Sequence, residues 1–148
     1  MAFFKYTFQK IVDLKSSEKT QAEWILSDAL AELRAQQALL EQYLQEQKSW
    51  ESKLEQSVLV AIPLSEVLII NQYIEYCAES IKLKKQDIMN AERKVFQKRQ
   101  ELASKMKEEK VWDKAKEHAF DKFKYETQLK EQNELDEMAS IRFMSPTS

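Results

Sequence analysis

One internal proline is the only strong helix breaker within the body of this 148-residue chain, which contains no glycine. Glycine normally makes up about 7% of a protein and supplies left-handed turns, tight bends and phosphate-binding loops. A sheet-rich fold needs many such turns, so this composition argues against one. The enrichment in Ala, Glu, Gln, Lys and Leu favours long helices instead. The only other proline, Pro146, lies near the end, so Pro63 is expected to separate two helices.

The break at Pro63 divides the chain into a shorter and a longer arm. We predict helix one at about 7–57, a turn at about 58–64, helix two at about 65–140 and a short C-terminal tail, as a single coiled-coil hairpin over residues 1–148. Ser65 is expected to cap the second helix, and Glu66 adds an acid to its first turn. The apolar stretch 58–62 fits either a packed turn or a contact site.

Both arms carry apolar residues at alternating steps of three and four, the spacing of a coiled-coil seam. In the first arm the seam is Ala22, Leu26, Ala29, Leu33, Gln36, Leu40, Tyr43, Gln47, Trp50 and Leu54. In the second it is Ile70, Ile74, Cys77, Ile81, Lys84, Ile88, Ala91, Val95, Lys98, Leu102, Lys105, Glu109, Trp112, Lys116, Ala119 and Phe123. Four residues are expected to widen the first stripe: Ile25, Leu30, Leu39 and Leu44. Phe4, Phe8 and Ile11 extend it toward the start, with a phase slip near residues 15–19.

Neither stripe can be buried by its own helix, and a short loop makes the arms antiparallel neighbours. The predicted fold is therefore all-α, a long two-helix antiparallel coiled-coil hairpin with a longer second helix. If the turn centres near Ala61, residue i faces roughly residue 122 minus i, so Phe8 lies near Trp112, and Trp50 lies near residues 70–74. From Lys122 onward no intramolecular partner is expected, which predicts a binding surface. A frayed terminus is the alternative.

Catalytic and metal chemistry is not expected in this chain. Cys77 and His118 are the only cysteine and histidine, and they are far apart on one predicted helix. They cannot form a nucleophile pair, and they are too few for an ordinary zinc site. The neighbouring carboxylates at 108–109 and 136–137 are interpreted as solvated charges. We expect no enzyme activity, no catalytic, metal or cofactor-binding residues, and no cofactor; Cys77 is expected to be a small buried seam residue.

Charge and hydropathy indicate a cytosolic protein. The formal net charge is -2, and the longest apolar run, at 58–64, is far shorter than the ~20 residues that span a bilayer. The start of the chain shows no signal-peptide pattern, so no direct bilayer insertion is expected. Residues 82–110 hold ten basic against five acidic residues, whereas residues 126–137 hold five acids against Lys130. A solvated helix face is a better interpretation of the basic stretch than a nucleic-acid site.

Three segments resemble the flagellar FliJ family. The opening reads Phe-Lys-Tyr-Thr-Phe-Gln-Lys-Ile-Val-Asp-Leu-Lys at residues 4–15, similar to the "F-x-F-Q-K" start of that family. Residues 71–74 read Asn-Gln-Tyr-Ile, similar to its "Q-aromatic-hydrophobic" segment. Residues 131–143, from Glu131 to Phe143, resemble its closing "E-x-D-E" segment with a following "R-F". Together with the length and the unequal arms, the resemblance covers nearly the whole chain.

The resemblance implies a stalk-like, monomeric component of the flagellar type III export apparatus. It would bind the pore of the hexameric export ATPase, promote ring assembly, and link the ring to the export gate protein FlhA and to export chaperones. It would then be cytoplasmic and peripherally associated with the gate at the inner face of the cell membrane. The candidate ATPase-binding residues are Phe4, Phe8, Glu134, Leu135, Asp136, Glu137, Arg142 and Phe143. The candidate gate-binding residues are Leu39, Tyr43, Trp50 and Tyr73.

Three other functions would also suit such a chain. The first is the equivalent stalk of a virulence type III secretion system. The second is a self-associating coiled-coil scaffold without an ATPase partner. The third is a nucleic-acid-binding hairpin that uses the basic stretch at 82–110, which would require salt-sensitive binding.

Overall fold

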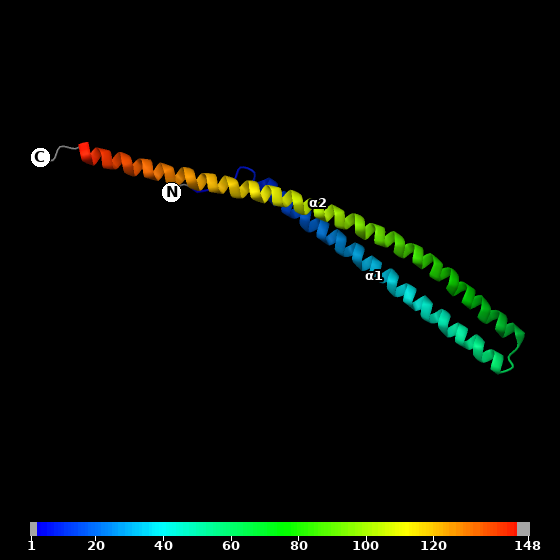
Figure 1. The fold of residues 1–148 in the computed structure, drawn as a ribbon. Coiled ribbons are helices and arrows are strands. Elements are labelled where there is room, and N and C mark those ends of the chain that lie inside the picture. Colours follow the sequence, from blue (N-terminus) through cyan, green and yellow to red (C-terminus); the bar gives the residue numbers. More distant parts are fainter. Residues whose placement is uncertain (1–2, 145–148) are drawn as a thin grey trace. The chain divides into compact units, whose positions relative to one another are not determined.

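Two long helices make up almost all of the part of the chain that the computed structural model describes, residues 3–144. Helix α1 spans Gln9–Leu59, and helix α2 spans Leu64–Met144 (Figure 1). They have 51 and 81 residues, respectively, and pack as an antiparallel hairpin without a strand in the described range. The predicted all-α hairpin with a longer second helix is confirmed.

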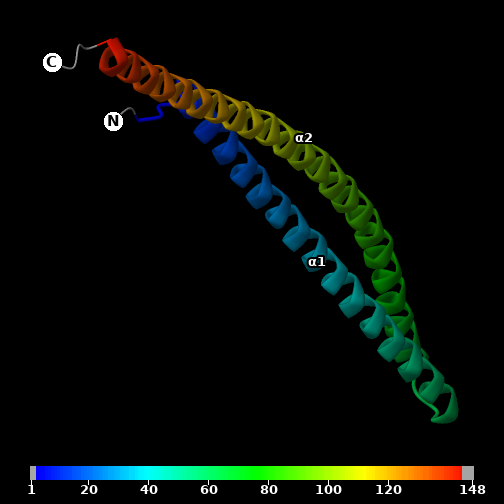
Figure 2. The same ribbon diagram turned by 60° about the vertical axis from the view of Figure 1, so that its left-hand side comes forward.

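The packing divides into two compact units, each built from a stretch of both helices. The turn unit comprises residues 22–102, and the terminal unit comprises residues 1–21 and 103–148. In the turn unit the two helices lie side by side from the connecting turn onward in both views (Figures 1 and 2). Each unit is described separately below.

The seam is the row of side chains that each helix turns toward the other. Every position of both predicted seams is buried or half-buried. The most buried of them are Ala29, Cys77, Ile81, Ala91 and Val95. The three- and four-residue spacing therefore identified the contact rows correctly.

The wider stripe predicted for the first helix is wrong for three of its four residues. Leu30 is half-buried, but Ile25, Leu39 and Leu44 are exposed. In a hairpin of two helices each helix has one neighbour, which covers only the narrow row of seam residues. The flanking apolar residues would be covered only by a third helix.

The predicted phase slip near residues 15–19 is also wrong. Val12 is buried and Ile11 is only half-buried, and the half-buried row continues through Lys15 and Lys19 to Ala22. These steps alternate between three and four residues, so the seam keeps its phase. The apolar pattern is interrupted because lysines occupy seam positions, where they pair with glutamates of α2.

Ring contacts fix the antiparallel register in each unit. In the terminal unit the ring centroids of Phe8 and Trp112 lie 6.0 Å apart. In the turn unit Trp50 stacks on Tyr73, with centroids 4.6 Å apart and an interplanar angle of 6°. Both contacts confirm the predicted pairings of Phe8 with Trp112 and of Trp50 with residues 70–74.

The connection between the helices runs through Pro63. The Pro63 carbonyl accepts hydrogen bonds from the backbone N–H groups of Glu66 (3.0 Å) and Val67 (3.4 Å), which makes Pro63 the N-cap residue of α2. The prediction of Ser65 as the cap is therefore wrong; Ser65 lies in the first turn, as does Glu66. Val58 and Leu59 are 82% and 86% exposed, which excludes a packed turn at these residues.

Within the terminal unit, the C-terminal end of α2 has no neighbouring helix in either view (Figures 1 and 2). Residues 128–144 are all exposed. The unpaired stretch begins later than the predicted Lys122, because Phe123 packs against Phe4. Helix α2 continues past Ser140 to Met144, and the rest of the predicted tail lies outside the described residues. No helix within 3–144 carries an apolar stretch suited to crossing a membrane.

Candidate functional site

An aromatic cluster joins the start of the chain to α2 in the terminal unit. The Phe4 ring lies 5.2 Å from that of Phe120 and 5.4 Å from that of Phe123. Tyr6 lies between Phe4 and Phe8, with centroids 6.4 Å and 5.8 Å from theirs. Because residues 3–6 precede α1, these rings are what attach the non-helical start to α2. Phe4 is half-buried, whereas Phe8 is 48% exposed.

The remaining candidate ATPase-binding residues lie on the unpaired end of α2. Glu134, Leu135, Asp136, Glu137, Arg142 and Phe143 are all exposed. Leu135 is twelve residues beyond Phe123, or ~18 Å along the helix at 1.5 Å per residue. The predicted set therefore forms two adjoining surfaces within the terminal unit: a packed aromatic cluster and a fully exposed helix end.

The candidate gate-binding residues divide in a similar way. Trp50 and Tyr73 form the stacked pair in the turn unit, and the Lys53 Nζ lies 4.3 Å from the centre of the Trp50 ring. Beside this pair Ile69, Gln72, Tyr73 and Tyr76 line a shallow groove. Tyr43 is half-buried in the seam, whereas Leu39 is exposed outside it. The structure thus brings together two of the four residues, and it adds Tyr76.

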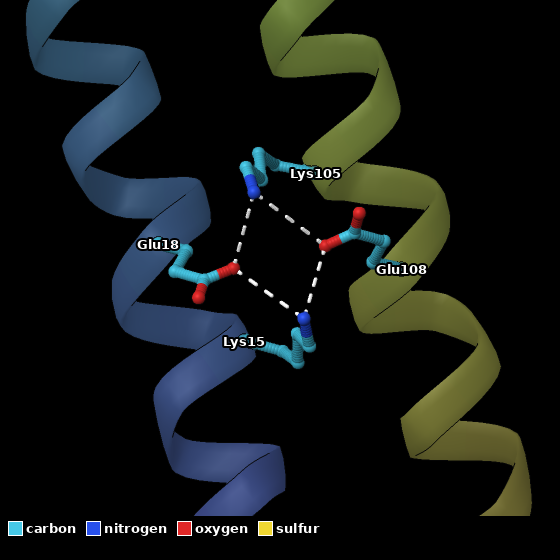
Figure 3. A network of polar contacts seen from close by, with 4 residues as sticks. All are labelled: Lys15, Glu18, Lys105 and Glu108. Carbon is cyan, nitrogen blue, oxygen red and sulfur yellow. Dashed lines mark hydrogen bonds and ion pairs between the residues drawn. The ribbon is translucent and has the colours of Figure 1, made fainter.

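A square of alternating charges crosses the seam of the terminal unit (Figure 3). Lys15 Nζ lies 3.2 Å from Glu108 Oε2 and 3.6 Å from Glu18 Oε2. Lys105 Nζ closes the square, 3.3 Å from Glu18 and 3.7 Å from Glu108. One position away, Lys19 pairs with Glu109 at 3.2 Å. Glu108 and Glu109 are therefore ion-paired across the seam, while the side chain of Glu108 remains 40% exposed.

The direct contact within this square shifts the titration of two groups. The hydrogen bond from Lys15 lowers the pKa of the Glu108 carboxyl, and the same bond raises the pKa of the Lys15 ammonium. Both shifts favour the charged forms. No set of three or more His, Cys, Asp or Glu side chains within 3–144 is placed to hold a metal ion.

Several exposed apolar residues were not singled out as sites in the sequence. Tyr76, Met89 and Phe96 on α2, and Trp24 on α1, are all exposed. Each lies outside the seam, and Met89 and Phe96 share a face because they are seven residues apart. Their spacing relative to the seam is the signal that would have identified them as outward-facing.

The chain matches one protein family, and its fold is similar to that of a solved structure. The model of the family "Flagellar FliJ protein" matches residues 4–148. No curated protein matches the chain. Among solved structures, the chain is similar to a protein from Chlamydia trachomatis described as a YscO homolog, with a TM-score of 0.71 and 19% sequence identity. The alignment covers 95% of this chain and 96% of that one, which shows that the two share this fold.

The family match extends over nearly the entire chain and includes the opening, central and closing segments that resemble FliJ proteins. The chain therefore belongs to the FliJ family of flagellar type III protein export.

Proposed function

We propose that this chain is the stalk of the flagellar export apparatus, acting by binding rather than by catalysis. In this proposal the end of the terminal unit enters the central pore of the hexameric export ATPase and promotes ring assembly and ATP hydrolysis. A stalk that presents different faces to identical subunits can bias their conformations unequally without chemistry of its own. An equivalent stalk in a virulence system would share the fold, and the family match favours the flagellar system.

The observation that carries the proposal is the exposed end of α2. Leu135, Ile141 and Phe143 are 66%, 64% and 92% exposed, on a helix that no other described segment covers. Exposed apolar side chains of this kind at the end of a helix indicate a site for a protein partner. The family to which the chain belongs supplies the class of partner, a component of the export machinery.

Capture of the purified chain by its cognate export ATPase, followed by a hydrolysis assay, tests this proposal. The full chain is expected to bind and to increase both hydrolysis and ring formation. Truncation after Lys130 removes the exposed end and is expected to abolish the stimulation while the helical circular dichroism per residue is retained. Full stimulation by the truncated chain would refute the placement of the ATPase-binding end.

A matched pair of variants separates loss of a specific surface from loss of apolar residues in general. Leu135→Ser with Phe143→Ser is expected to weaken ATPase capture about tenfold or more, since buried apolar anchors dominate interface energies. Val58→Ser with Leu59→Ser removes equally exposed residues at the other end of the hairpin, so capture should be unchanged. Equal losses in both variants would argue against an end-specific site.

The second part of the proposal assigns the stacked pair and its groove to the export gate protein FlhA. Tyr73, which stacks on the Trp50 ring, and Tyr76, which lines the groove with Tyr73, are both exposed, and aromatic residues of this kind are frequent binding hot spots. Tyr73→Ala with Tyr76→Ala should weaken capture by the cytoplasmic domain of FlhA. Trp24→Ala, which removes an exposed aromatic side chain of α1, is the control and should leave capture intact.

Export chaperones and a peripheral location complete the proposed function. The chain would be cytoplasmic and would bind the inner face of the cell membrane only through the gate. Fractionation of cells tests this directly: a tagged chain should move from the membrane fraction to the soluble fraction when FlhA is deleted. Membrane retention without FlhA would contradict the proposed attachment.

A further inference from the structure

A second apolar surface lies on the outer side of α2 in the turn unit. Met89 and Phe96 are 54% and 63% exposed, and the seven residues between them place both on one face. A shallow groove there is lined by Met89, Glu92, Arg93, Phe96, Gln97 and Gln100. None of these six residues belongs to the seam, so the groove has no role in closing the hairpin.

Four basic side chains surround this groove without ion-pair partners. Lys82, Lys85, Arg93 and Arg99 are exposed, and they lie three, four or seven residues from Met89 or Phe96. The structure pairs the intervening lysines instead: Lys84 with Asp87, Lys94 with Glu32 and Lys98 with Glu101. Within 3–144, none of the four forms a salt bridge. Arg93 lines the groove and the other three lie near it, so the rim around the apolar centre is basic on balance, with the carboxylate of Glu92 as its one acid.

An acidic amphipathic helix is the ligand that matches this rim and centre. Such a helix places apolar side chains in a groove and carboxylates beside the basic rim. A nucleic acid would satisfy the basic residues, but it would leave the exposed apolar side chains of Met89 and Phe96 without a partner. The apolar centre therefore favours a peptide helix.

The chain itself presents a helix of this kind at the end of α2. Glu131, Leu135 and Met138 follow steps of four and three residues, and Glu134 lies four residues before Met138, so all four lie on one side of the helix. All four are exposed, and the surrounding stretch 126–137 has five acids against one lysine. No salt bridge within 3–144 involves these carboxylates.

From this complementarity we infer that a second copy of the chain docks residues 131–138 of its α2 onto the Met89–Phe96 groove of the first. Leu135 and Met138 would contact Met89 and Phe96, while Glu131 and Glu134 would face Arg93 and Arg99. The contact joins two different surfaces, so it can repeat from copy to copy and is heterologous. It is a weak, reversible association of a chain that is monomeric when dilute, and it does not depend on the proposed function.

Sedimentation equilibrium of the purified full chain tests this inference. At low ionic strength the weight-average mass should rise with concentration in the micromolar range. Raising the salt to about 1 M shortens the Debye length to about 3 Å and should reduce the association at least several-fold. Phe96→Ala should weaken it about tenfold, with unchanged helicity because the side chain lies outside the seam. A chain that stays monomeric at all concentrations would overturn the inference.

A charge exchange identifies the two surfaces. Variant A carries Arg93→Glu and Arg99→Glu, and variant B carries Glu131→Lys and Glu134→Lys. Each variant alone brings like charges together and should remain monomeric. In an equimolar mixture every contact between A and B is again complementary, so association should return. Lys10→Glu with Lys48→Glu changes the net charge as variant A does, at exposed residues of α1 that form no salt bridge in the described range, and should associate like the unaltered chain.

Two results would contradict the inference even if the chain associates. One is association of variant A that equals that of the unaltered chain, and the other is a mixture of A and B that stays monomeric. If the chain stays monomeric and binds a short DNA duplex, and variant A loses that DNA binding, the basic rim is a nucleic-acid site instead. Variant A should still stimulate the export ATPase, so failure of the inference and failure of the proposed function are separable.

Discussion

At the scale of single residues, the seam of the terminal unit combines ion pairs with apolar contacts. Lys15, Lys19, Lys105 and Glu109 occupy seam positions where a regular coiled coil would have Leu or Ile. Their partners lie on the opposite helix, so the pairs form only in one register. We interpret this charged layer as a device that fixes the alignment of the helices, in the way that polar seam residues specify register in other coiled coils.

The charged square should contribute stability only over a defined pH range. The pKa of Glu108 is lowered from its ordinary 4.5, so its contribution is complete above that value and is lost as pH falls through the folded-state pKa. The pKa of Lys15 is raised from 10.5, so its contribution is complete below that value and is lost as pH rises through the folded-state pKa. Glu108→Gln should therefore lower the melting temperature slightly at about pH 7 and have a smaller effect at about pH 3.

Thermal unfolding followed by circular dichroism measures this difference. Glu75→Gln, at an exposed position without a salt bridge in the described range, should leave the melting temperature unchanged at both pH values. The effect of Glu108→Gln should also diminish at high salt, because exposed charges are screened. A shift of equal size at both pH values would contradict the role assigned to the ion pairs.

The thiol of Cys77 should be almost unreactive in the folded chain. Cys77 is 1% exposed, and burial raises the pKa of its thiol, which lowers the thiolate fraction at neutral pH. Labelling by a maleimide should be slow under native conditions and fast in denaturant. Cys77→Ala with Ala78→Cys moves the thiol to an exposed neighbouring position and should label rapidly in both. Equally rapid labelling of native Cys77 would show that the turn unit opens there.

At the scale of elements, the hairpin turn is closed by Pro63 and leaves its apolar residues outside. Pro63 suits the N-cap position because it needs no hydrogen-bond partner for a backbone N–H. The side chains of Val58, Leu59 and Val60 project away from the seam and are exposed. Of the two explanations for this apolar stretch, a contact site agrees with the observed exposure.

Substitutions at the turn should therefore have little effect on stability. Val58→Ser with Leu59→Ser should change the free energy of unfolding by less than about 0.5 kcal/mol, as is usual for exposed positions. Ile81→Ala, at a buried seam position, should cost about 2–5 kcal/mol. Urea denaturation of both variants checks this contrast. A turn variant as unstable as Ile81→Ala would mean that the apolar turn is packed.

At the scale of the whole molecule, α2 is longer than α1, so the end of α2 in the terminal unit has no part of α1 to pack against. Beyond Thr127, α2 has no described neighbour, and its backbone is stabilised by hydrogen bonds of the helix alone. Isolated helices of this length are marginal in water. Residues 128–144 should therefore exchange amide hydrogens much faster than the seam around Cys77 and Val95.

Removal of this end should leave the rest of the fold intact. Truncation after Lys130 is expected to move the melting temperature by less than about 2 °C, because it removes only exposed side chains. Phe123→Ala, which removes the ring that contacts Phe4, should lower it further than the truncation does. Calorimetry of the two proteins tests this order. A larger loss from the truncation would show that the end packs on the hairpin.

The sequence by itself determined the seam, because the three- and four-residue period depends only on the geometry of one helix. It therefore identified Cys77, Ala91 and Val95 as buried and placed Phe8 opposite Trp112. The family was also identifiable from the opening and closing segments, because they are contiguous in sequence. Binding to the ATPase and to the gate, and the residues that would carry it, remain proposals, since a binding surface is defined together with its partner.

Only the tertiary structure decided what lies on either side of the seam. The exposure of Ile25, Leu39 and Leu44 depends on how many helices surround α1, which a single helix does not encode. The unbroken seam at Lys15 and Lys19 depends on glutamates far away in sequence. The start of the unpaired end was set by Phe4, which reaches Phe123 from outside any helix. Each of these features depends on contacts between segments that are distant in sequence, whereas the three- and four-residue period depends on the geometry of a single helix.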